Sequence, residues 1–293
     1  MTNKAGLIAL AGRPNAGKST FLNFILGEKV SIVSDKPQTT RNRILGVYHD
    51  EGLQIGFLDL PGIHKPKFQL NQRMMKAVQR ALADVDLIFH FIDLSIPVGS
   101  GDQFAHEYLK RAGKPVILVP NKMDLVNKTK VLAKLQQLSE RFDPEALVPV
   151  SAKTGDNLSR LIETASAYMP EGERLFEEDT LTDQPLRFMA QEFIREKLLH
   201  YTRDEIPHAV AVTLESYEQN EDDTISIGAV IWVEKTSQRR IILGTQGQMI
   251  AKITRGARRS LKGLLGKPVY LELFVKVEQN WRDKDSFVTD LEF

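Results

Sequence analysis

Apolar and polar positions follow a repeating order over the first part of the chain. Short apolar runs such as 7–11, 55–58 and 116–119 are followed by stretches with helical spacing, and the last of these covers 158–165. Strands that alternate with helices predict a mostly parallel sheet with helices on both faces. Ligands in such a fold bind beyond the carboxyl ends of the strands. We therefore expect an α/β domain over residues 1–172.

The pattern changes beyond an acidic stretch, residues 173–184, which shows no clear period and is predicted to be a linker. Residues 185–293 follow a different order. They show one helical segment and then strands in which every second residue is apolar, at 186–200, 210–214, 225–233 and 269–277. This order predicts a second, smaller α+β domain.

A glycine-rich loop connects the first predicted strand to the first predicted helix and fits the phosphate-binding pattern G-x-x-x-x-G-K-S/T. We predict nucleotide contacts from Gly12, Arg13, Pro14, Asn15, Ala16, Gly17, Lys18, Ser19 and Thr20. The two glycines let backbone N–H groups face the phosphates beside the positive end of the helix. Lys18 is expected to reach the β- and γ-phosphates, and Ser19 offers a hydroxyl for Mg²⁺. A plain glycine turn is the alternative, which the strand, loop and helix order disfavours.

A second segment follows the next apolar strand and consists of Asp59, Leu60, Pro61 and Gly62. A carboxylate in the place of Asp59 is suited to the metal of a nucleotide site. The N–H of Gly62 is available to a γ-phosphate, so residues 60–80 are candidates for a segment that becomes ordered with GTP. The four residues alone would indicate a turn, but after a phosphate loop the metal and phosphate roles are favoured.

A third segment follows the strand over 116–119 and consists of Asn121, Lys122, Met123 and Asp124. The carboxylate of Asp124 can accept hydrogen bonds from two N–H groups of guanine, which adenine does not offer. Lys122 is expected to lie along the ring. A backbone N–H toward the guanine oxygen is expected from a fourth segment, made of Ser151, Ala152 and Lys153. We therefore expect GTP to be bound and ATP to be rejected.

The amino-acid composition excludes several kinds of functional site. The 293 residues include no cysteine, which excludes disulfides, thiolate zinc sites and cysteine nucleophiles and fits a reducing compartment. The six histidines lack metal-ligand spacing. The first five residues lead into a predicted strand without the apolar region of a signal peptide, and no window reaches the length of a membrane span. We therefore expect a cytoplasmic protein.

The second domain contains a Gly-x-x-Gly loop that leads into a helix, the arrangement with which KH domains clamp single-stranded nucleic acid. The loop consists of Gly244, Thr245, Gln246 and Gly247. Residues 235–271 include nine basic residues and no acidic residue, although the net charge of the whole chain is only +1. This concentration of charge predicts nucleic-acid binding. A solvated helix face and binding to anionic lipids are the alternatives.

These motifs, in this order and spacing, resemble the Era family of GTPases, and the resemblance covers essentially all 293 residues. It implies a P-loop GTPase domain followed by a type II KH domain. It also implies a factor that binds the 3′ end of 16S ribosomal RNA, uses Mg²⁺ with GTP or GDP, and assists assembly of the 30S subunit. We expect a monomer that binds no DNA, with peripheral contact at the cytoplasmic face of the inner membrane as an open alternative.

The resemblance assigns residues 36–41 to the first switch segment of the nucleotide site. Within this segment, Thr40 is expected to bind Mg²⁺ together with Ser19 and Asp59. Thr39 is the alternative.

Catalysis is expected without the glutamine that many GTPases place after the second segment, because this chain has Ile63 there. We expect Lys18, Thr40 and the backbone N–H of Gly62 to stabilise charge on the phosphate oxygens instead. Asn15 resembles the asparagine with which related GTPases hold K⁺ against the phosphates. K⁺ is therefore a candidate cofactor beside Mg²⁺.

The Gly-x-x-Gly loop lacks the basic residue that KH loops often carry. RNA contacts are therefore also expected from the helix after the loop, at Lys252, Arg255, Arg258 and Arg259. Two other functions stay open. One is an RNA-binding assembly module with negligible hydrolysis, and the other is a GTPase that docks on a membrane or a protein.

Overall fold

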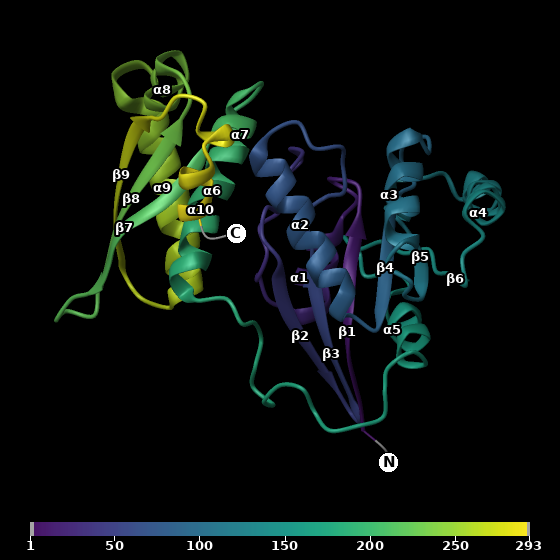
Figure 1. The fold of residues 1–293 in the computed structure, drawn as a ribbon. Helices are drawn as coiled ribbons and strands as arrows, with labels where there is room; N and C mark the ends of the chain where they lie inside the picture. Colours follow the sequence, from purple (N-terminus) through teal and green to yellow (C-terminus); the bar gives the residue numbers. More distant parts are fainter. Residues whose placement is uncertain (1–2, 292–293) are drawn as a thin grey trace. The chain divides into compact units, whose positions relative to one another are not determined.

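A six-stranded sheet organises the first unit of the computed structural model, which describes residues 3–291 (Figure 1). The strands are β1 (Lys4–Gly12), β2 (Ile44–Asp50), β3 (Leu53–Asp59), β4 (Leu87–Asp93), β5 (Val116–Asn121) and β6 (Ala146–Leu147). Their order is β2-β3-β1-β4-β5-β6, and every neighbouring pair is parallel except β2 and β3. Met1 and Thr2, which belong to the predicted start, lie outside the described residues.

Helices cover both faces of this sheet, as the alternation of strands and helices predicts. They are α1 (Lys18–Leu26), α2 (Gln69–Asp84), α3 (Ser100–Lys110), the 3-10 turn η1 (Met123–Leu125), α4 (Lys128–Phe142) and α5 (Leu158–Ser166). Val78 of α2 and Leu109 of α3 share a buried cluster with Ile88 of β4. On the other face, the ring of Phe21 from α1 lies 5.3 Å from that of Phe57 in β3. The α/β fold class is therefore confirmed for the first unit.

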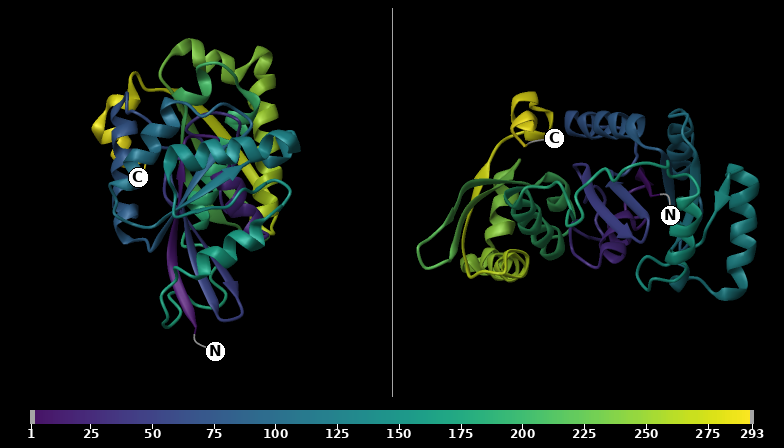
Figure 2. Two further views of the ribbon diagram at one scale, coloured as in Figure 1. Left: turned by 90° about the vertical axis from the view of Figure 1, so that its right-hand side faces the viewer. Right: turned by 90° about the horizontal axis from the view of Figure 1, so that it is seen from below.

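A three-stranded sheet organises the second unit. Its elements are α6 (Leu186–Tyr201), α7 (Ile206–Ala209), β7 (Ala211–Gln219), β8 (Ile225–Val233), α8 (Thr236–Leu243), η2 (Thr245–Gly247), α9 (Gln248–Leu265), β9 (Val269–Val277), η3 (Trp281–Asp283) and α10 (Asp285–Asp290). The order is β7-β8-β9, in which β7 and β8 are antiparallel and β8 and β9 are parallel. The turn between β7 and β8 projects from the rest of the unit (Figure 2, right). The predicted α+β class is confirmed.

Alternation along β8 builds the core of the second unit. The odd-numbered residues of the strand are all buried: Ile225, Ile227, Ala229, Ile231 and Val233. The long helices α6 and α9 add buried side chains at intervals of three and four, such as Ile194 and Leu198 in α6. The helix predicted over 186–200 and the strands predicted over 225–233 and 269–277 therefore match the structure closely.

Contacts divide the chain between Asp183 and Gln184, near the end of the predicted linker. The first unit comprises residues 1–33, 40–66 and 72–183, and the second comprises 34–39, 67–71 and 184–293. Two short segments of the first half of the sequence thus group with the second unit.

The predicted linker is held firmly against the first unit over much of its length. Oε1 of Gln54 accepts hydrogen bonds from the backbone N–H groups of Leu175 (2.7 Å) and Phe176 (3.0 Å). The N–H of Val47 in β2 donates to the carbonyl of Leu181 at 2.9 Å. Phe176 also packs against the core cluster of the sheet. These contacts could not be predicted from the acidic composition of the segment, because they depend on Gln54 and Val47, which lie more than 120 residues away in the sequence.

Candidate functional site

The loop between β1 and α1 requires its two glycines. Gly12 and Gly17 have φ angles of +138° and +97°, which L side chains rarely adopt. A Cβ on Gly12 would lie 2.4 Å from the carbonyl oxygen of Phe91, and a Cβ on Gly17 would lie 2.1 Å from Nδ2 of Asn121. Asn15 also has a positive φ of 63°, a conformation that asparagine tolerates better than most residues. The backbone of the loop is therefore fixed by steric contacts.

Lys18 begins α1 and is buried, with 5% of its surface exposed. Its Nζ donates to the carbonyl of Arg13 at 3.2 Å. Burial lowers the pKa of Lys18, and the charge of Asp59 opposes this shift. A buried ammonium group is stabilised by an added anion, so the position of Lys18 suits a phosphate. Thr20 follows in the first turn of the same helix.

Three oxygen-bearing side chains meet at the start of α1. The Oγ of Ser19 donates to Oδ2 of Asp59 at 2.5 Å and lies 3.0 Å from Oγ1 of Thr40. Asp59 is fully buried, and within the described part of the chain its Oδ1 has no hydrogen-bond partner. Burial raises the pKa of Asp59, while Lys18 and the neighbouring hydroxyl groups lower it. An orphaned carboxylate oxygen beside two hydroxyls is a donor set that fits Mg²⁺.

Ser31 also contacts this carboxylate, although no sequence pattern singled it out. Its hydroxyl is fully buried and donates to Oδ2 of Asp59 at 2.8 Å. The side chain of Asn23 in α1 holds the segment in place, because its Oδ1 accepts from the N–H groups of Val30 and Ser31. Ser31 could be found only from the folded chain, since 28 residues separate it from Asp59.

The segment from Leu60 to Ile63 packs directly on the phosphate loop. The N–H of Leu60 donates to Leu10, and the N–H of Ile63 donates to the carbonyl of Gly12 at 2.9 Å. A Cβ on Gly62 would lie 2.6 Å from the backbone nitrogen of Pro14. The side chain of Ile63 is buried in the core cluster of the sheet. Gly62 thus lies against the phosphate loop, whereas Ile63 contributes to the core.

Asn121 connects the base segments with the phosphate loop. Its Nδ2 donates to the carbonyl of Ala16 at 2.8 Å, and its Oδ1 accepts from the N–H of Ala152 at 2.9 Å. Asp124 is exposed, and its Oδ1 accepts from the hydroxyl of Ser151 at 2.7 Å. The N–H of Met123 donates to the carbonyl of Val150, while the side chain of Lys153 is exposed. The third and fourth predicted segments therefore form one site with the phosphate loop.

Lys122 is positioned by a carboxylate that sequence analysis did not assign. Lys122 has a φ of 67°, and its Nζ lies 2.6 Å from Oδ2 of Asp93 at the end of β4. Burial alone would raise the pKa of Asp93, but hydrogen bonds from Lys122 and Ser95 hold it below its usual value. The ion pair fixes the ammonium group of Lys122 at the end of β4.

The Gly-x-x-Gly loop forms a tight turn between α8 and α9. Gly244 and Gly247 have φ angles of +71° and +77°, and a Cβ on Gly244 would lie 2.7 Å from Cβ of Met249. Thr245 and Gln246 are exposed at the tip of the turn. The loop therefore presents its backbone to solvent just before the N-terminus of an 18-residue helix.

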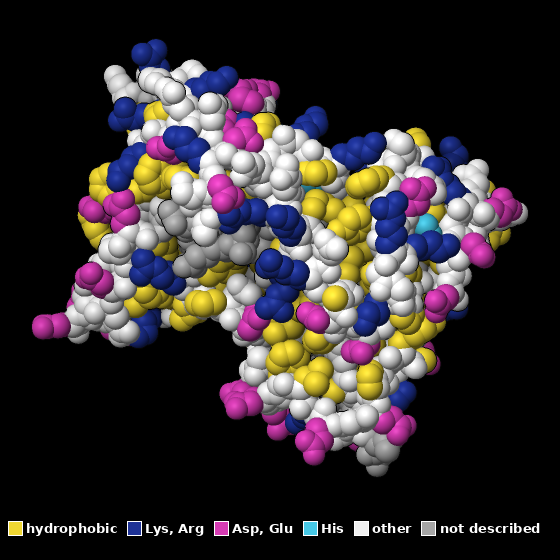
Figure 3. Space-filling view, viewed as in Figure 1, with side chains coloured by type: hydrophobic (Ala, Val, Ile, Leu, Met, Phe, Trp, Pro, Cys, Tyr) yellow, Lys and Arg dark blue, Asp and Glu magenta, His cyan; other side chains and the backbone are white. Residues whose placement is uncertain are grey.

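Basic side chains lie on the exposed surface of α9. Lys252, Arg255, Arg258 and Arg259 are all exposed, whereas Ile253 on the opposite face is buried. Nζ of Lys252 lies 4.6 Å from the centre of the Tyr201 ring. Lys and Arg side chains also surround α8, at the upper left of Figure 3. The predicted concentration of positive charge is thus accessible around the loop.

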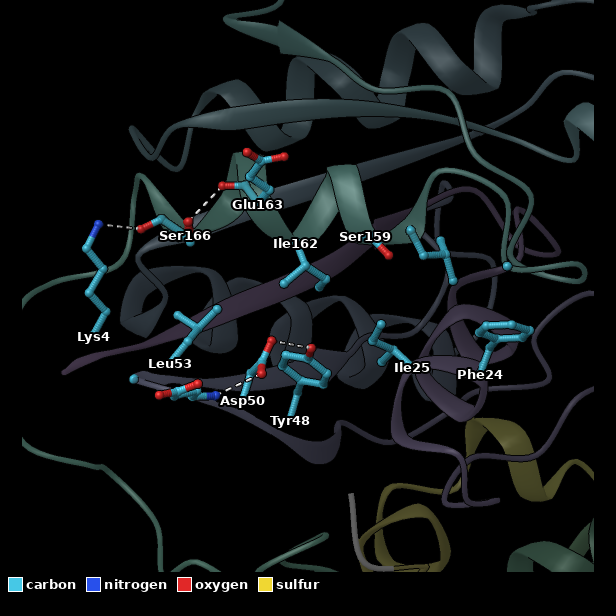
Figure 4. A pocket seen from close by; sticks show the side chains of 14 residues that line it. Lys4, Phe24, Ile25, Tyr48, Asp50, Leu53, Ser159, Ile162, Glu163 and Ser166 are labelled. Atoms are coloured by element: carbon cyan, nitrogen blue, oxygen red, sulfur yellow. Dashed lines mark hydrogen bonds between the residues drawn. The ribbon is translucent and has the colours of Figure 1, made fainter. Parts of the chain in front are cut away.

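A separate hollow of about 540 Å³ opens on the first unit (Figure 4). It is lined by α1, the β2–β3 turn and α5, and it contains no residue of the four nucleotide segments. Two of its polar side chains are engaged within the first unit, because Lys4 donates to the carbonyl of Ser166 and Tyr48 donates to Asp50. No helix within residues 3–291 is long and apolar enough to cross a membrane.

Known protein families match segments in both halves of the chain. A family model described as a 50S ribosome-binding GTPase matches residues 7–122, and a KH-domain model matches residues 205–282. A crystal structure of Era with MgGDPNP and nucleotides 1506–1542 of 16S ribosomal RNA has 39% identity and a TM-score of 0.95, covering 99% of both chains. A variant of Aquifex aeolicus Era bound to GDP and AlF4⁻ has 39% identity and a TM-score of 0.94, again over 99% of both chains.

Proposed function

Since this chain belongs to the Era family of GTPases, as its 39% identity over 99% of its length with an Era of known structure shows, we propose that it hydrolyses GTP as a molecular switch and binds the 3′ end of 16S ribosomal RNA. The observation that carries this proposal is one folded site in which Asn121 joins the phosphate loop to the base segments. We further propose that the protein acts in assembly of the 30S subunit, as a cytoplasmic monomer.

In the proposed reaction, Ser19, Thr40 and Asp59 would hold Mg²⁺, which neutralises charge on the phosphate oxygens when it is bound with the nucleotide. Lys18 supplies a second positive charge from a buried position. The N–H of Gly62 would donate to the γ-phosphate while that phosphate is present. Ile63 lies in the core and has no polar atom on its side chain with which to orient water, so we expect positioning and charge stabilisation to supply the rate enhancement.

We propose K⁺ as an additional cofactor held by Asn15, whose backbone lies in the phosphate loop with a positive φ. The test is single-turnover hydrolysis in K⁺ and in Na⁺ buffers of equal ionic strength. Faster turnover in K⁺ is expected, and an Asn15→Ala variant should lose the difference. Equal rates of the unaltered protein in both buffers would remove K⁺ from the account.

RNA binding is proposed for the Gly244–Gly247 turn together with the exposed basic side chains of α9. In this proposal the exposed tip of the turn, Thr245 and Gln246, lies against the phosphates, and the arginines add charge that the turn itself lacks. Peripheral binding to anionic lipid is the second candidate for the same charge. Binding to the RNA but not to vesicles that contain anionic lipid would favour the first candidate.

The nucleotide proposal is tested by comparing GTP with ATP in binding and hydrolysis. The unaltered protein is expected to prefer GTP by roughly 10⁴-fold or more, because adenine would leave polar groups of the site unpaired. Asp124→Asn should lose most of this preference. Asp143→Asn, the same change at the end of α4, is the matched control. Equal affinity of the unaltered protein for GTP and ATP would refute the proposed function.

A further inference from the structure

Asp102 on α3 is joined to the phosphate loop by a partly shielded ion pair. Its Oδ2 accepts from Nη1 of Arg13 at 3.0 Å and from the N–H of Gly99 at 2.8 Å. The side chain of Asp102 is 6% exposed, and that of Arg13 is 37% exposed. None of the four nucleotide segments includes α3. The pair therefore connects the nucleotide site with a helix that sequence patterns do not associate with it.

The surface of α3 is shaped to receive the guanidinium group. A Cβ on Gly101 would lie 2.9 Å from Nε of Arg13 and 3.2 Å from its Cζ. Any larger residue at position 101 would therefore displace the arginine from the helix. Asp102 is held from its own side as well, because its bond to Gly99 caps the start of α3.

The backbone of Arg13 contacts other residues of the nucleotide site. Its carbonyl oxygen accepts from Nζ of Lys18 at 3.2 Å and from the N–H of Ala16 at 3.4 Å. The residues on either side of Arg13 contact Gly62, the last residue of the second segment, and Ile63, which follows it. Gly12 accepts from the N–H of Ile63, and Pro14 lies where a Cβ of Gly62 would collide. The guanidinium group thus anchors the residue whose carbonyl accepts from Lys18 and whose two neighbours contact Gly62 and Ile63.

We propose that Asp102 is a positioning residue of the nucleotide site, acting through Arg13 to fix the phosphate loop for binding of the β- and γ-phosphates. This inference rests on the proposed function. Arg13 then contributes to the site in two ways, with its backbone toward the nucleotide and its side chain toward α3. The base segments also have contacts of their own, from the hydroxyl of Ser151 to Asp124 and from the N–H of Met123 to Val150, so Asp102 should influence phosphate binding without altering the choice of base.

The test measures GDP and IDP affinity by competition against a fluorescent GDP analogue. Asp102→Asn retains an oxygen to cap α3 but removes the charge that holds Arg13. It is expected to weaken GDP binding by about tenfold, the factor that corresponds to one charge-assisted hydrogen bond. The ratio of GDP to IDP affinity, which reports the exocyclic amine of guanine, should stay unchanged. Glu107→Gln, which likewise replaces a carboxylate by an amide but at an exposed position of α3, is the control.

A double-mutant cycle separates positioning from general loss of structure. Arg13→Gln, Asp102→Asn and the double variant should weaken GDP binding by the same factor, because either change removes the same pair. Factors that multiply, or a change in the GDP to IDP ratio, would overturn the inference. Failure of the unaltered protein to bind GDP would instead count against the proposed function, so the two failures are distinguishable.

Discussion

Thr39 and Thr40 are neighbours in the sequence, but their hydroxyl groups have different partners. Oγ1 of Thr40 lies 3.0 Å from Oγ of Ser19, whereas Oγ1 of Thr39 donates to the carbonyl of Lys36 at 2.7 Å. Only Thr40 is placed to share a cation with Ser19 and Asp59. The choice between the two threonines, which the sequence left open, can therefore be tested directly.

Thr40→Val is expected to lower the Mg²⁺-dependent affinity for GTP by about tenfold or more, because a metal-binding hydroxyl is lost. Thr39→Val is the matched control and should retain most of that affinity. The measurement is a titration with a fluorescent GTP analogue, with and without Mg²⁺. Equal losses in the two variants would contradict the assignment of Thr40.

Two buried imidazole rings make the stability of the first unit depend on pH. His90 and His106 are stacked with ring centres 5.4 Å apart, and both are buried. Burial, with contributions from the charges of His106 and Lys18, lowers the pKa of His90 to about 3, and burial also lowers the pKa of His106. Both pKa values lie below that of histidine in the unfolded chain. The stabilising contribution is therefore complete above about pH 6.5 and is lost as the pH falls below it.

His90→Phe is expected to reduce this loss, because one titrating ring is removed. Between about pH 6 and pH 5, the free energy of unfolding should fall less steeply than in the unaltered protein, by up to about 1.4 kcal/mol per pH unit. Urea denaturation at several pH values measures the slope. His200→Phe, at an exposed position in α6, should leave it unchanged. Identical slopes for His90→Phe and the unaltered protein would contradict this reading.

At the scale of elements, Gln54 in β3 holds the segment after α5 against the sheet. The side chain is buried, accepts from Leu175 and Phe176, and donates to the carbonyl of Phe176 at 2.8 Å. Gln54→Ala would leave these backbone groups without partners, so we expect the first unit to lose roughly 2–4 kcal/mol of stability. Gln136→Ala on the exposed face of α4 is the control. A loss no larger than that of the control would show that the segment is not held by Gln54.

The basic face of α9 makes a separate prediction about RNA affinity. Arg255→Gln and Arg259→Gln should each reduce the slope of log affinity against log salt concentration by about 0.7, the value for one phosphate contact on a single strand. Lys130→Gln in α4 is the charge-matched control. The measurement is fluorescence anisotropy with a labelled RNA from the 3′ end of 16S ribosomal RNA at several salt concentrations. An unchanged slope in both arginine variants would place the RNA elsewhere.

Elements with strong periodicity could be predicted from the sequence, and elements that depend on distant contacts could not. The apolar runs gave β1, β3 and β5, and alternation gave β8 and β9, because burial of one or both faces leaves a local pattern. No prediction covered β2, whose antiparallel pairing with β3 follows from a short turn at Gly52. Residues 173–184 were predicted to be a linker for a similar reason, because the contacts that hold them come from Gln54 and Val47.

The residues of the candidate site also divide into those that a local sequence pattern predicts and those that depend on distant contacts. The first three of its four segments begin at the carboxyl ends of β1, β3 and β5, and the fourth follows β6 by a few residues, so the alternation of strands and helices predicts that all four meet. Ser31, Asp93 and Asp102 contact those segments from other elements, across separations of 28, 29 and 89 residues. Such partners depend on how the helices pack on the sheet, and no local pattern encodes that packing.

At the scale of the whole molecule, the central claim is that one chain joins a guanine-nucleotide site to an RNA-binding unit. Coupling between the two ligands must be reciprocal in affinity, because it is a single free energy. If RNA changes the affinity for GTP, GTP changes the affinity for RNA by the same factor. If RNA does not change the affinity for GTP, the two units of the protein bind their ligands independently.

The most direct test is GTP hydrolysis in K⁺ buffer, with and without a single-stranded RNA that carries the 3′ end of 16S ribosomal RNA. A scrambled RNA of the same length and the Asp124→Asn variant serve as controls. Our account predicts faster turnover with the native RNA than with the scrambled one, and little GTP turnover in the variant. Turnover that is the same with native RNA, scrambled RNA and no RNA would contradict the claim that nucleotide and RNA act on one switch.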